Sequence, residues 1–175
     1  MAGFTLRDLY EVGSSRAALH LLQSIFVTEL LRPSRRLWIV SPWISDIELI
    51  DNSARQFSTL CPEWPATKIR VSIVLASLMR RGSHVMVIVN EAHHNDDFVA
   101  RMRSDTSIPT DSLTIIRSEE LHEKGILGDY FTLDGSMNLT FSGVYLNEEH
   151  LIYRCDLASV EQRRLELENR WRQHL

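Results

Sequence analysis

The stretch "KIRVSIVLASLMRRGSHVMVIVN", residues 68–90, decides the fold class of this chain. Residues 68–81 have the length and the apolar spacing of a helix, and Gly82 follows as the expected C-terminal cap. The apolar run that begins at His84 is typical of a buried strand. A helix that passes through Arg-Arg-Gly into such a strand predicts one half of a βαβ unit.

The chain before this stretch supplies the other half of the unit. "LWIVS", residues 37–41, is a second short apolar run, and Pro42 stops it. We therefore expect parallel strands at residues 37–41 and 85–89. A helix is predicted over residues 16–32, where apolar residues recur at helical spacing until a proline ends the run.

The chain after this stretch continues to alternate between helices and strands. Its predicted elements are a helix, a strand, a polar hairpin, a strand and a charged helix capped by Ser159, at residues 95–104, 111–118, 121–138, 149–155 and 159–175. Residues 46–65 show no regular pattern. No repeat or linker interrupts the sequence, so we expect residues 1–175 to form one α/β domain.

Composition and charge exclude few functions. The 175 residues are 44% hydrophobic and 24% charged, which is ordinary for a globular domain with its own core. The net charge of −4 argues against a broad nucleic-acid-binding surface. A small basic site is still compatible with it, because contacts with phosphate depend on local charge.

The sequence shows no targeting features. No window approaches the run of about 18 apolar residues that a membrane-spanning helix needs. The N-terminal residues lack a basic start followed by an apolar stretch, so we expect no secretory signal. Cys61 and Cys155 are far apart and form no Cys-x-x-Cys pattern. We expect a cytoplasmic protein with reduced thiols and no membrane contact.

The stretch "LHEKGILGDYFTLDGSMN", residues 121–138, predicts a β-hairpin with polar side chains. Gly128-Asp129 is a favoured two-residue turn between two runs that resemble strands. Pairing outward from this turn puts His122 opposite Gly135, which leaves room for a substrate to approach the backbone. The alternation of side chains along a strand puts His122 and Lys124 on one face.

Two more polar residues follow the predicted hairpin. Ser136 and Asn138 lie where the chain leaves the second strand, near His122. The imidazole can attack or donate a proton, while Lys124 and these two side chains can donate hydrogen bonds to phosphate oxygens. The pattern indicates a site that handles phosphate. The alternative is an ordinary hairpin with a chance polar face.

The same residues carry a family resemblance. "HEKGILGD" followed by "GSMN" resembles the HxKxxxxD…GSxN motif of the phospholipase D superfamily. The matched positions are His122, Lys124, Asp129, Gly135, Ser136 and Asn138. "LWIVSPWIS" and "RRGSHVMVIVN" are similar to the family's opening strand and to its helix-to-strand step. The chain has one residue fewer than the usual pattern between Asp129 and Gly135, which puts the structural role of Asp129 in question.

The resemblance implies a fold and a mechanism. The fold would be a mixed, mostly parallel sheet with helices on both faces. One histidine would attack phosphorus to form a phosphohistidine, and a second would protonate the leaving oxygen, without a metal or another cofactor. Because this chain has one HxK motif, a homodimer should bring His122 of each subunit to a shared two-fold axis. Small single-motif members of the superfamily are typically nucleases or related phosphodiesterases.

Residues outside the motif are further candidates for the site. "NEE" at residues 147–149 resembles the place of the family's acidic residue that orients the histidine, which implies Glu149, with Glu148 as the competing choice. His94 lies in a polar loop after a strand and is a candidate for substrate contact, because no complete set of metal ligands surrounds it. Trp43 is a candidate for stacking on a base, although such a residue is more often core or interface.

The function predicted from the sequence is a nuclease that hydrolyses DNA in the bacterial cytoplasm. The alternative is a catalytically silent dimer that binds DNA or a partner protein in a DNA-modification or phage-defence system. Such systems contain small proteins that the hairpin region resembles. Hydrolysis of lipids or of small phosphodiesters is a third possibility. Arg163-Arg164 alternate with glutamates and are interpreted as a solvated helix face with no DNA contact.

Overall fold

The computed structural model describes residues 6–10 and 15–175. Its centre is a seven-stranded sheet with the strand order β1-β9-β8-β7-β2-β5-β6. The strands are β1 (Leu6–Tyr10), β2 (Arg36–Val40), β5 (His84–Val89), β6 (Leu113–Arg117), β7 (Gly125–Leu127), β8 (Thr132–Gly135) and β9 (His150–Arg154). Part of the N-terminal stretch in which the sequence predicts no secretory signal lies outside the described residues.

The pairing of strands in this sheet is mixed. β2 pairs in parallel with β5, which confirms the predicted parallel strands, and β5 also pairs in parallel with β6. The pairings β1–β9, β9–β8, β8–β7 and β7–β2 are antiparallel. The sheet is therefore mixed, as expected, but the expectation of a mostly parallel sheet is wrong. Its antiparallel half contains the β7–β8 hairpin, which a short turn closes, while residues 136–149 with α4 connect β8 to β9.

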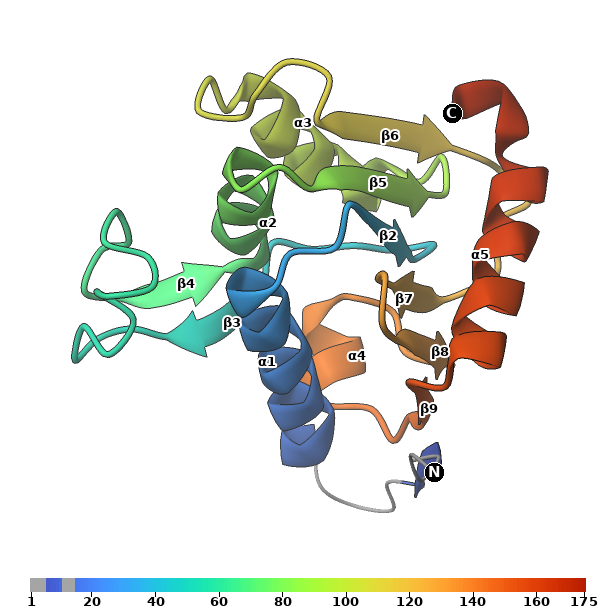
Figure 1. Cartoon of the computed structure of the whole chain (residues 1–175), viewed down its shortest axis with the longest axis horizontal. Helices are drawn as coiled ribbons and strands as arrows, with labels where there is room; N and C mark the ends of the chain where they lie inside the picture. Colours follow the sequence, from blue (N-terminus) through green and yellow to red (C-terminus); the bar gives the residue numbers. More distant parts are fainter. Residues whose placement is uncertain (1–5, 11–14) are drawn as a thin grey trace.

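Helices cover both faces of the sheet (Figure 1). The helices of one face are α1 (Ser15–Leu31), α2 (Val71–Arg80), α3 (Asp96–Ser104) and α4 (Phe141–Tyr145), and α5 (Leu157–Arg170) lies on the other. Side chains of β2 alternate between the two layers: Leu37 and Ile39 join the core under α1 and α2, while Trp38 and Val40 join the core under α5. A strand buried on both faces reads as the continuous apolar run seen in the sequence.

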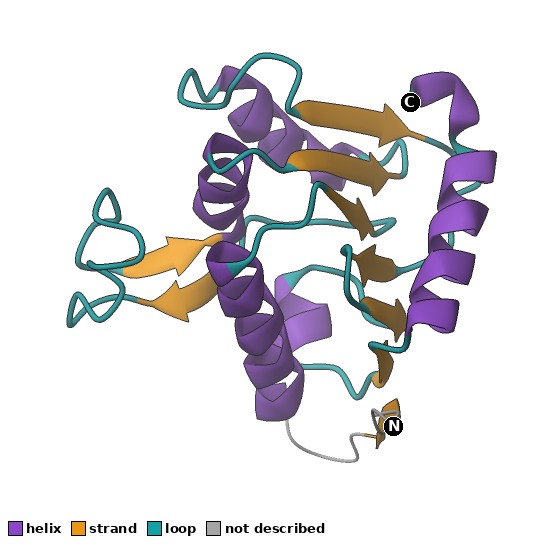
Figure 2. Cartoon of the chain, in the orientation of Figure 1, coloured by secondary structure: helices purple, strands orange, loops and turns teal. Residues whose placement is uncertain are grey.

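The predicted helix over residues 68–81 begins later than expected. Its first residues form β4 (Lys68–Arg70), which pairs with β3 (Glu48–Asp51) in a separate two-stranded ribbon that projects from the body (Figure 2). α2 then begins at Val71, and a residue distant in sequence caps it. The carboxylate of Asp46 accepts from the backbone N–H and the hydroxyl of Ser72, both at 2.9 Å. The ribbon also replaces part of the expected irregular segment.

The ends of two helices test the predicted caps. Gly82 has a φ of +96° and its N–H donates to the Met79 carbonyl at 3.0 Å, as expected of a glycine after a helix. The cap of α5 is Asp156 and not Ser159, because the Asp156 carboxylate accepts from the Ser159 N–H at 2.9 Å. Aspartate outside the first turn accepts from the free N–H groups at this end.

Two further expectations concern location and thiols. Within the described part of the chain, no helix is both long and apolar enough to cross a membrane. Cys61 is buried, Cys155 is exposed, and neither forms a disulfide bond.

Candidate active site

The sheet topology brings the ends of several strands to one edge. β2 ends at Val40, which lies opposite Gly125 at the start of β7, and Gly125 lies opposite Asp134 near the end of β8. Lys124 and Ser136 therefore come just beyond these strands at the same edge. A pocket opens there, and its lining includes Lys124.

The hairpin that carries the motif exists, but its register differs from the predicted one. Leu127 pairs with Thr132, and the Gly128 N–H donates to the Phe131 carbonyl at 3.0 Å, so Asp129-Tyr130 form the tip. Each residue therefore pairs two positions away from its expected partner. Continued in this register, the pairing would place Lys124, and not His122, opposite Gly135. A shift by two leaves the face of each side chain unchanged.

The histidine–lysine segment is held in place from the opposite side. Leu121 is buried in the core under α5, and Glu123 forms ion pairs with Arg163 and Arg170 of that helix. His122 lies between these two anchors and is exposed. Lys124 folds back over the same segment, and its Nζ donates to the His122 carbonyl at 2.7 Å.

Ser136 and Glu149 lie together at the end of β8. The Ser136 hydroxyl donates to Glu149 Oε2 and accepts from the His150 N–H at 3.0 Å. Glu149 Oε1 accepts from the Asn147 side-chain amide at 3.2 Å. In the described part of the chain no hydrogen bond joins Glu149 to His122, so the orienting role stays a prediction. The competing Glu148 is exposed and shares none of these contacts.

Asn138 is positioned by backbone on two sides. The Trp43 N–H contacts Asn138 Oδ1 at 3.5 Å, which orients the amide oxygen toward β2. Gly143 packs so closely that a Cβ there would lie 2.2 Å from the Asn138 carbonyl oxygen. Among the described residues the Asn138 Nδ2 has no partner, so it can donate to a ligand. The Trp43 ring itself is 46% exposed beside it.

Glycine is required at position 135 because of the backbone conformation, which the sequence did not reveal. Its φ is +153°, which side chains rarely adopt, and a Cβ would lie 2.0 Å from the His150 carbonyl oxygen. The expected reason, room for a substrate opposite His122, does not hold because the register differs. The residue instead permits β8 to approach β9.

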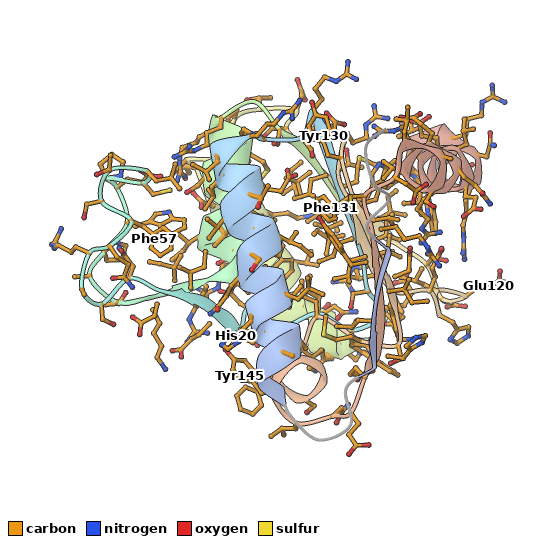
Figure 3. The ribbon with its side chains drawn as sticks, turned by 60° about the horizontal axis from the view of Figure 1, so that its bottom comes forward. His20, Phe57, Glu120, Tyr130, Phe131 and Tyr145 are labelled. Atoms are coloured by element: carbon orange, nitrogen blue, oxygen red, sulfur yellow. The ribbon has the colours of Figure 1, made fainter. Side chains whose placement is uncertain are left out.

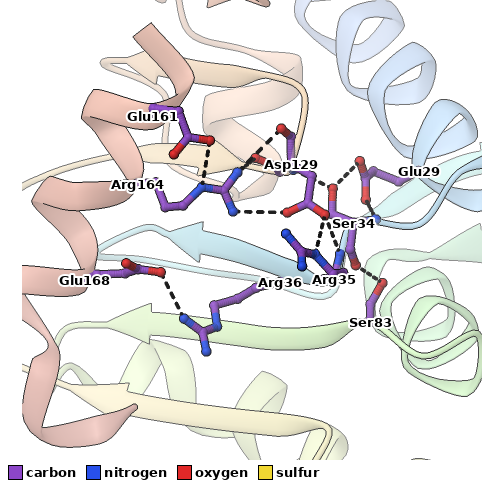
Figure 4. A network of polar contacts seen from close by, with 10 residues as sticks. Glu29, Ser34, Arg35, Arg36, Ser83, Asp129, Glu161, Arg164 and Glu168 are labelled. Atoms are coloured by element: carbon purple, nitrogen blue, oxygen red, sulfur yellow. Dashed lines mark hydrogen bonds and ion pairs between the residues drawn. The ribbon is translucent and has the colours of Figure 1, made fainter. Parts of the chain in front are cut away.

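Asp129 occupies the far end of the hairpin, away from the other motif residues. Its carboxylate accepts from the Arg35 N–H at 2.9 Å and from Arg164 at 3.1 Å (Figure 4). Burial alone would raise the pKa of Asp129, but these donors outweigh burial and lower it. Asp129 therefore attaches the hairpin to α5 and lies at the opposite end of the hairpin from Lys124 and Gly135. The shortened turn has left this structural role intact.

The attachment extends into the core beyond the hairpin tip. The Asp129 N–H donates to the Ser34 hydroxyl at 2.7 Å, and this hydroxyl donates to the buried Glu29 carboxylate at 2.9 Å. Burial raises the pKa of Glu29, even though the donors of Ser34 oppose the shift. The tip is thus fixed by the connection between α1 and β2, which explains why the turn falls one residue later than predicted.

His94 lies in a short 3₁₀ turn, His93–Asn95, that follows β5. Its Nε2 is 2.9 Å from the Ser45 hydroxyl, and the Ser45 N–H donates to the Leu139 carbonyl at 2.9 Å. His94 is therefore linked to the loop that carries Asn138. The neighbouring His93 instead contacts Asp96 at 3.1 Å. Where side chains are described, no group of three or more His, Cys, Asp or Glu is placed to hold a metal ion.

The arginines of α5 were misjudged from the sequence. The side chain of Arg163 is only 13% exposed and pairs with Asp134 at 3.0 Å as well as with Glu123. Burial would lower the pKa of Arg163, but these two carboxylates outweigh it and raise the pKa. Arg163 and Arg164 are thus not on a solvated face, although they remain unassigned to DNA. The alternation of side chains could have indicated this contact, because it makes Glu123 point away from His122 and Lys124, toward the side where α5 packs.

Comparisons with known proteins agree with this architecture. No family model and no curated protein sequence matches the chain. The structure nevertheless has the phospholipase D-like fold.

Three solved structures illustrate the likeness. NucT from Helicobacter pylori is 16% identical with a TM-score of 0.61, and the match covers 98% of this chain and 96% of that one. Nuc from Salmonella typhimurium, a phospholipase D family member, is 15% identical with a TM-score of 0.60, over 99% and 97%. TrmBL2, an archaeal chromatin protein, is 9% identical with a TM-score of 0.55, over 96% and 52%. At these identities the likeness establishes the fold.

Proposed function

We propose that this chain is a metal-independent phosphodiesterase, and specifically a nuclease that hydrolyses DNA. The observation that supports the proposal is that the His122–Lys124 segment and Ser136 lie next to strand ends at one edge of a phospholipase D-like sheet, with Asn138 two residues beyond Ser136. The motif order and the fold are independent of each other, and both support the same chemistry. DNA is favoured over lipid because the sequence has no membrane-binding feature.

The proposed reaction has two steps. The imidazole of His122 attacks phosphorus and forms a P–N bond while the P–O bond to the leaving group breaks. The partner subunit's His122 donates a proton to the leaving oxygen. The same partner imidazole then takes a proton from water, which attacks phosphorus, breaks the P–N bond and releases the product with a phosphate end.

The other residues would bind or position. Lys124 and Asn138 Nδ2 would donate to the phosphate oxygens and neutralise their charge. Ser136 is the third expected donor, and it would have to turn its hydroxyl from Glu149 to the phosphate. Glu149 would then be free to orient His122. Trp43 and His94, which flank the Asn138 loop, would contact the substrate on either side of this group.

The test is cleavage in the presence of EDTA. Purified protein is incubated with DNA and with a chromogenic phosphodiester, beside His122→Ala and the matched control His20→Ala, an exposed histidine of α1. We expect wild type and His20→Ala to cleave both substrates in EDTA, and the cleavage rate of His122→Ala to be lower by about a thousandfold. Equal rates for wild type and His122→Ala would refute the proposal.

A second candidate function is a catalytically silent protein that binds DNA. It is favoured by one observation, since the DNA-binding chromatin protein TrmBL2 has a similar fold. In that case wild type and His122→Ala would both retain labelled DNA in an electrophoretic shift assay, and neither would cleave it. Such a protein could act with partner proteins of a DNA-modification or defence system.

A further inference from the structure

A second pocket lies beside the proposed active site. It is formed between the ribbon of β3 and β4 and the short helix α4. Phe141 and Tyr145 line one side, and Lys68 and Arg70 line the other. Neither the motif nor the predicted chemistry uses these four residues.

The aromatic side of the pocket presents a ring to solvent. The rings of Phe141 and Tyr145 are stacked, with centroids 4.9 Å apart and an angle of 23° between their planes. The Tyr145 hydroxyl donates to the Glu48 carbonyl, which ties the pair to the ribbon. Phe141 is nevertheless 57% exposed. A large apolar ring that is held rigid and left open to solvent is suited to stacking with a flat ligand.

The charged side of the pocket leaves one cation uncompensated. Glu48 pairs with Lys68 at 3.0 Å, and Asp46 pairs with Arg101 at 3.1 Å. Arg70 forms no ion pair with any residue that the structure describes, and its Nη1 donates only to the Asp46 backbone carbonyl at 2.6 Å. Its remaining guanidinium donors are available to an anion, and a planar guanidinium matches the geometry of phosphate oxygens.

The pocket and the proposed site are linked through the segment that follows Asn138. Phe141 follows Asn138 by three residues, a span of at most about 11 Å even in fully extended chain. The rim of the pocket at Ser45 is hydrogen-bonded to the Leu139 carbonyl at 2.9 Å. A nucleic acid whose phosphate is bound at Asn138 would therefore reach this pocket with its neighbouring nucleotide.

We propose that this pocket binds the nucleotide adjacent to the scissile phosphate, in single-stranded nucleic acid. Phe141 stacks on the base, and Arg70 binds the next phosphate of the strand. A base can offer its face to Phe141 only when it is unpaired and unstacked, which is why the substrate is a single strand. This inference rests on the proposed function, because it assigns a substrate class to the same site.

The experiment compares a single-stranded oligonucleotide, its duplex and a chromogenic phosphodiester. The variants are Phe141→Ala, Arg70→Gln and the matched control Leu146→Ala, an apolar residue that is 65% exposed at the end of α4. We expect wild type to prefer the single strand. Phe141→Ala should lower the ratio of kcat/KM on the oligonucleotide to that on the diester by about tenfold, the effect of one stacking contact. Arg70→Gln should lower this ratio by about tenfold as well, because it removes a hydrogen bond to a charged phosphate. Leu146→Ala should leave the ratio unchanged.

A binding measurement separates this inference from the proposed chemistry. Fluorescence anisotropy of a labelled single strand is measured with each variant in the His122→Ala background, where no cleavage interferes. A tenfold weaker affinity with Phe141→Ala supports the pocket even if His122 proves not to be the nucleophile. Equal affinity for single strand and duplex overturns the inference. So does a change in oligomeric mass with Phe141→Ala, which would assign the ring to a subunit interface.

Discussion

Gly135 shows how one motif residue is determined by backbone geometry. Its φ of +153° and the 2.0 Å approach of a Cβ to the His150 carbonyl leave no space for any other residue. Gly82 also has a positive φ, of +96°, but a Cβ there meets nothing within 4 Å. A substitution of Gly82 would therefore cause conformational strain alone, whereas one of Gly135 would cause strain and steric overlap.

We expect Gly135→Ala to destabilise the protein more than Gly82→Ala does. Strain alone costs about 1 kcal/mol, whereas overlap with β9 adds a backbone displacement that we place at about 2 kcal/mol more. For a domain of this size, the melting temperature should fall by about 3 °C for Gly82→Ala and about 9 °C for Gly135→Ala. Thermal unfolding monitored by circular dichroism measures both, and equal shifts would show that overlap does not matter.

At this scale the sequence predicted residue types better than contacts. The spacing of His122, Lys124 and Asn138 identified a phosphate-handling pattern, because side-chain chemistry is visible in sequence. The engagement of the Ser136 hydroxyl by Glu149 was not predictable, since it joins the residue after β8 to the residue before β9. The anchoring role of Glu123 was visible only through strand parity.

The β7–β8 hairpin is the element in which the prediction came closest and still missed the register. Its existence follows from the turn signal and the flanking apolar residues. The position of its tip depends on Ser34 and Arg164, which lie 95 and 35 residues away in sequence. Local patterns contain no information about such contacts. Asp129 makes both of these contacts at the tip of the hairpin.

We expect Asp129→Asn to remove a pH-dependent part of the stability. Because the folded pKa of Asp129 is lowered, its contribution is present above the ordinary aspartate pKa of about 4 and is lost as pH falls through the lower folded pKa. The variant should be about 2 kcal/mol less stable at pH 7, and the difference should shrink in acid.

Urea unfolding between pH 3 and pH 7 measures this difference. Glu120→Gln is the matched control, because Glu120 points into solvent (Figure 3) and should leave the stability curve unchanged. A deficit of Asp129→Asn that stays constant down to pH 3 would show that the carboxylate charge is not what attaches the hairpin.

At the scale of the molecule, the sequence predicted the parallel half of the sheet and most helices. Long periodic segments such as α1 and α5 carry enough pattern to be recognised. The short elements were missed, among them the β3–β4 ribbon and α4, because three to five residues hold too little periodicity. The excess of antiparallel pairs was also missed, because local patterns do not show which strands become neighbours in the sheet.

A homodimeric site predicts a particular mixing behaviour. We expect a solution mass of twice that of one chain, and an equal mixture of wild-type and His122→Ala subunits, after exchange, to retain about one quarter of the wild-type activity. Only dimers with two intact histidines would complete both steps. Size-exclusion chromatography with light scattering and a cleavage assay give the two numbers. Retention of one half would indicate that each chain works alone.

The position of α5 near the end of the chain determines when the ion pairs of the hairpin can form during synthesis. Arg163 and Arg164, which pair with Glu123, Asp134 and Asp129, are translated well after the hairpin that they hold. While the nascent chain is still short of residue 163, these carboxylates have no arginine from α5 beside them. The ion pairs that hold the histidine–lysine segment therefore form only after α5 has left the ribosome. A chain interrupted before residue 163 would carry the motif without these ion pairs.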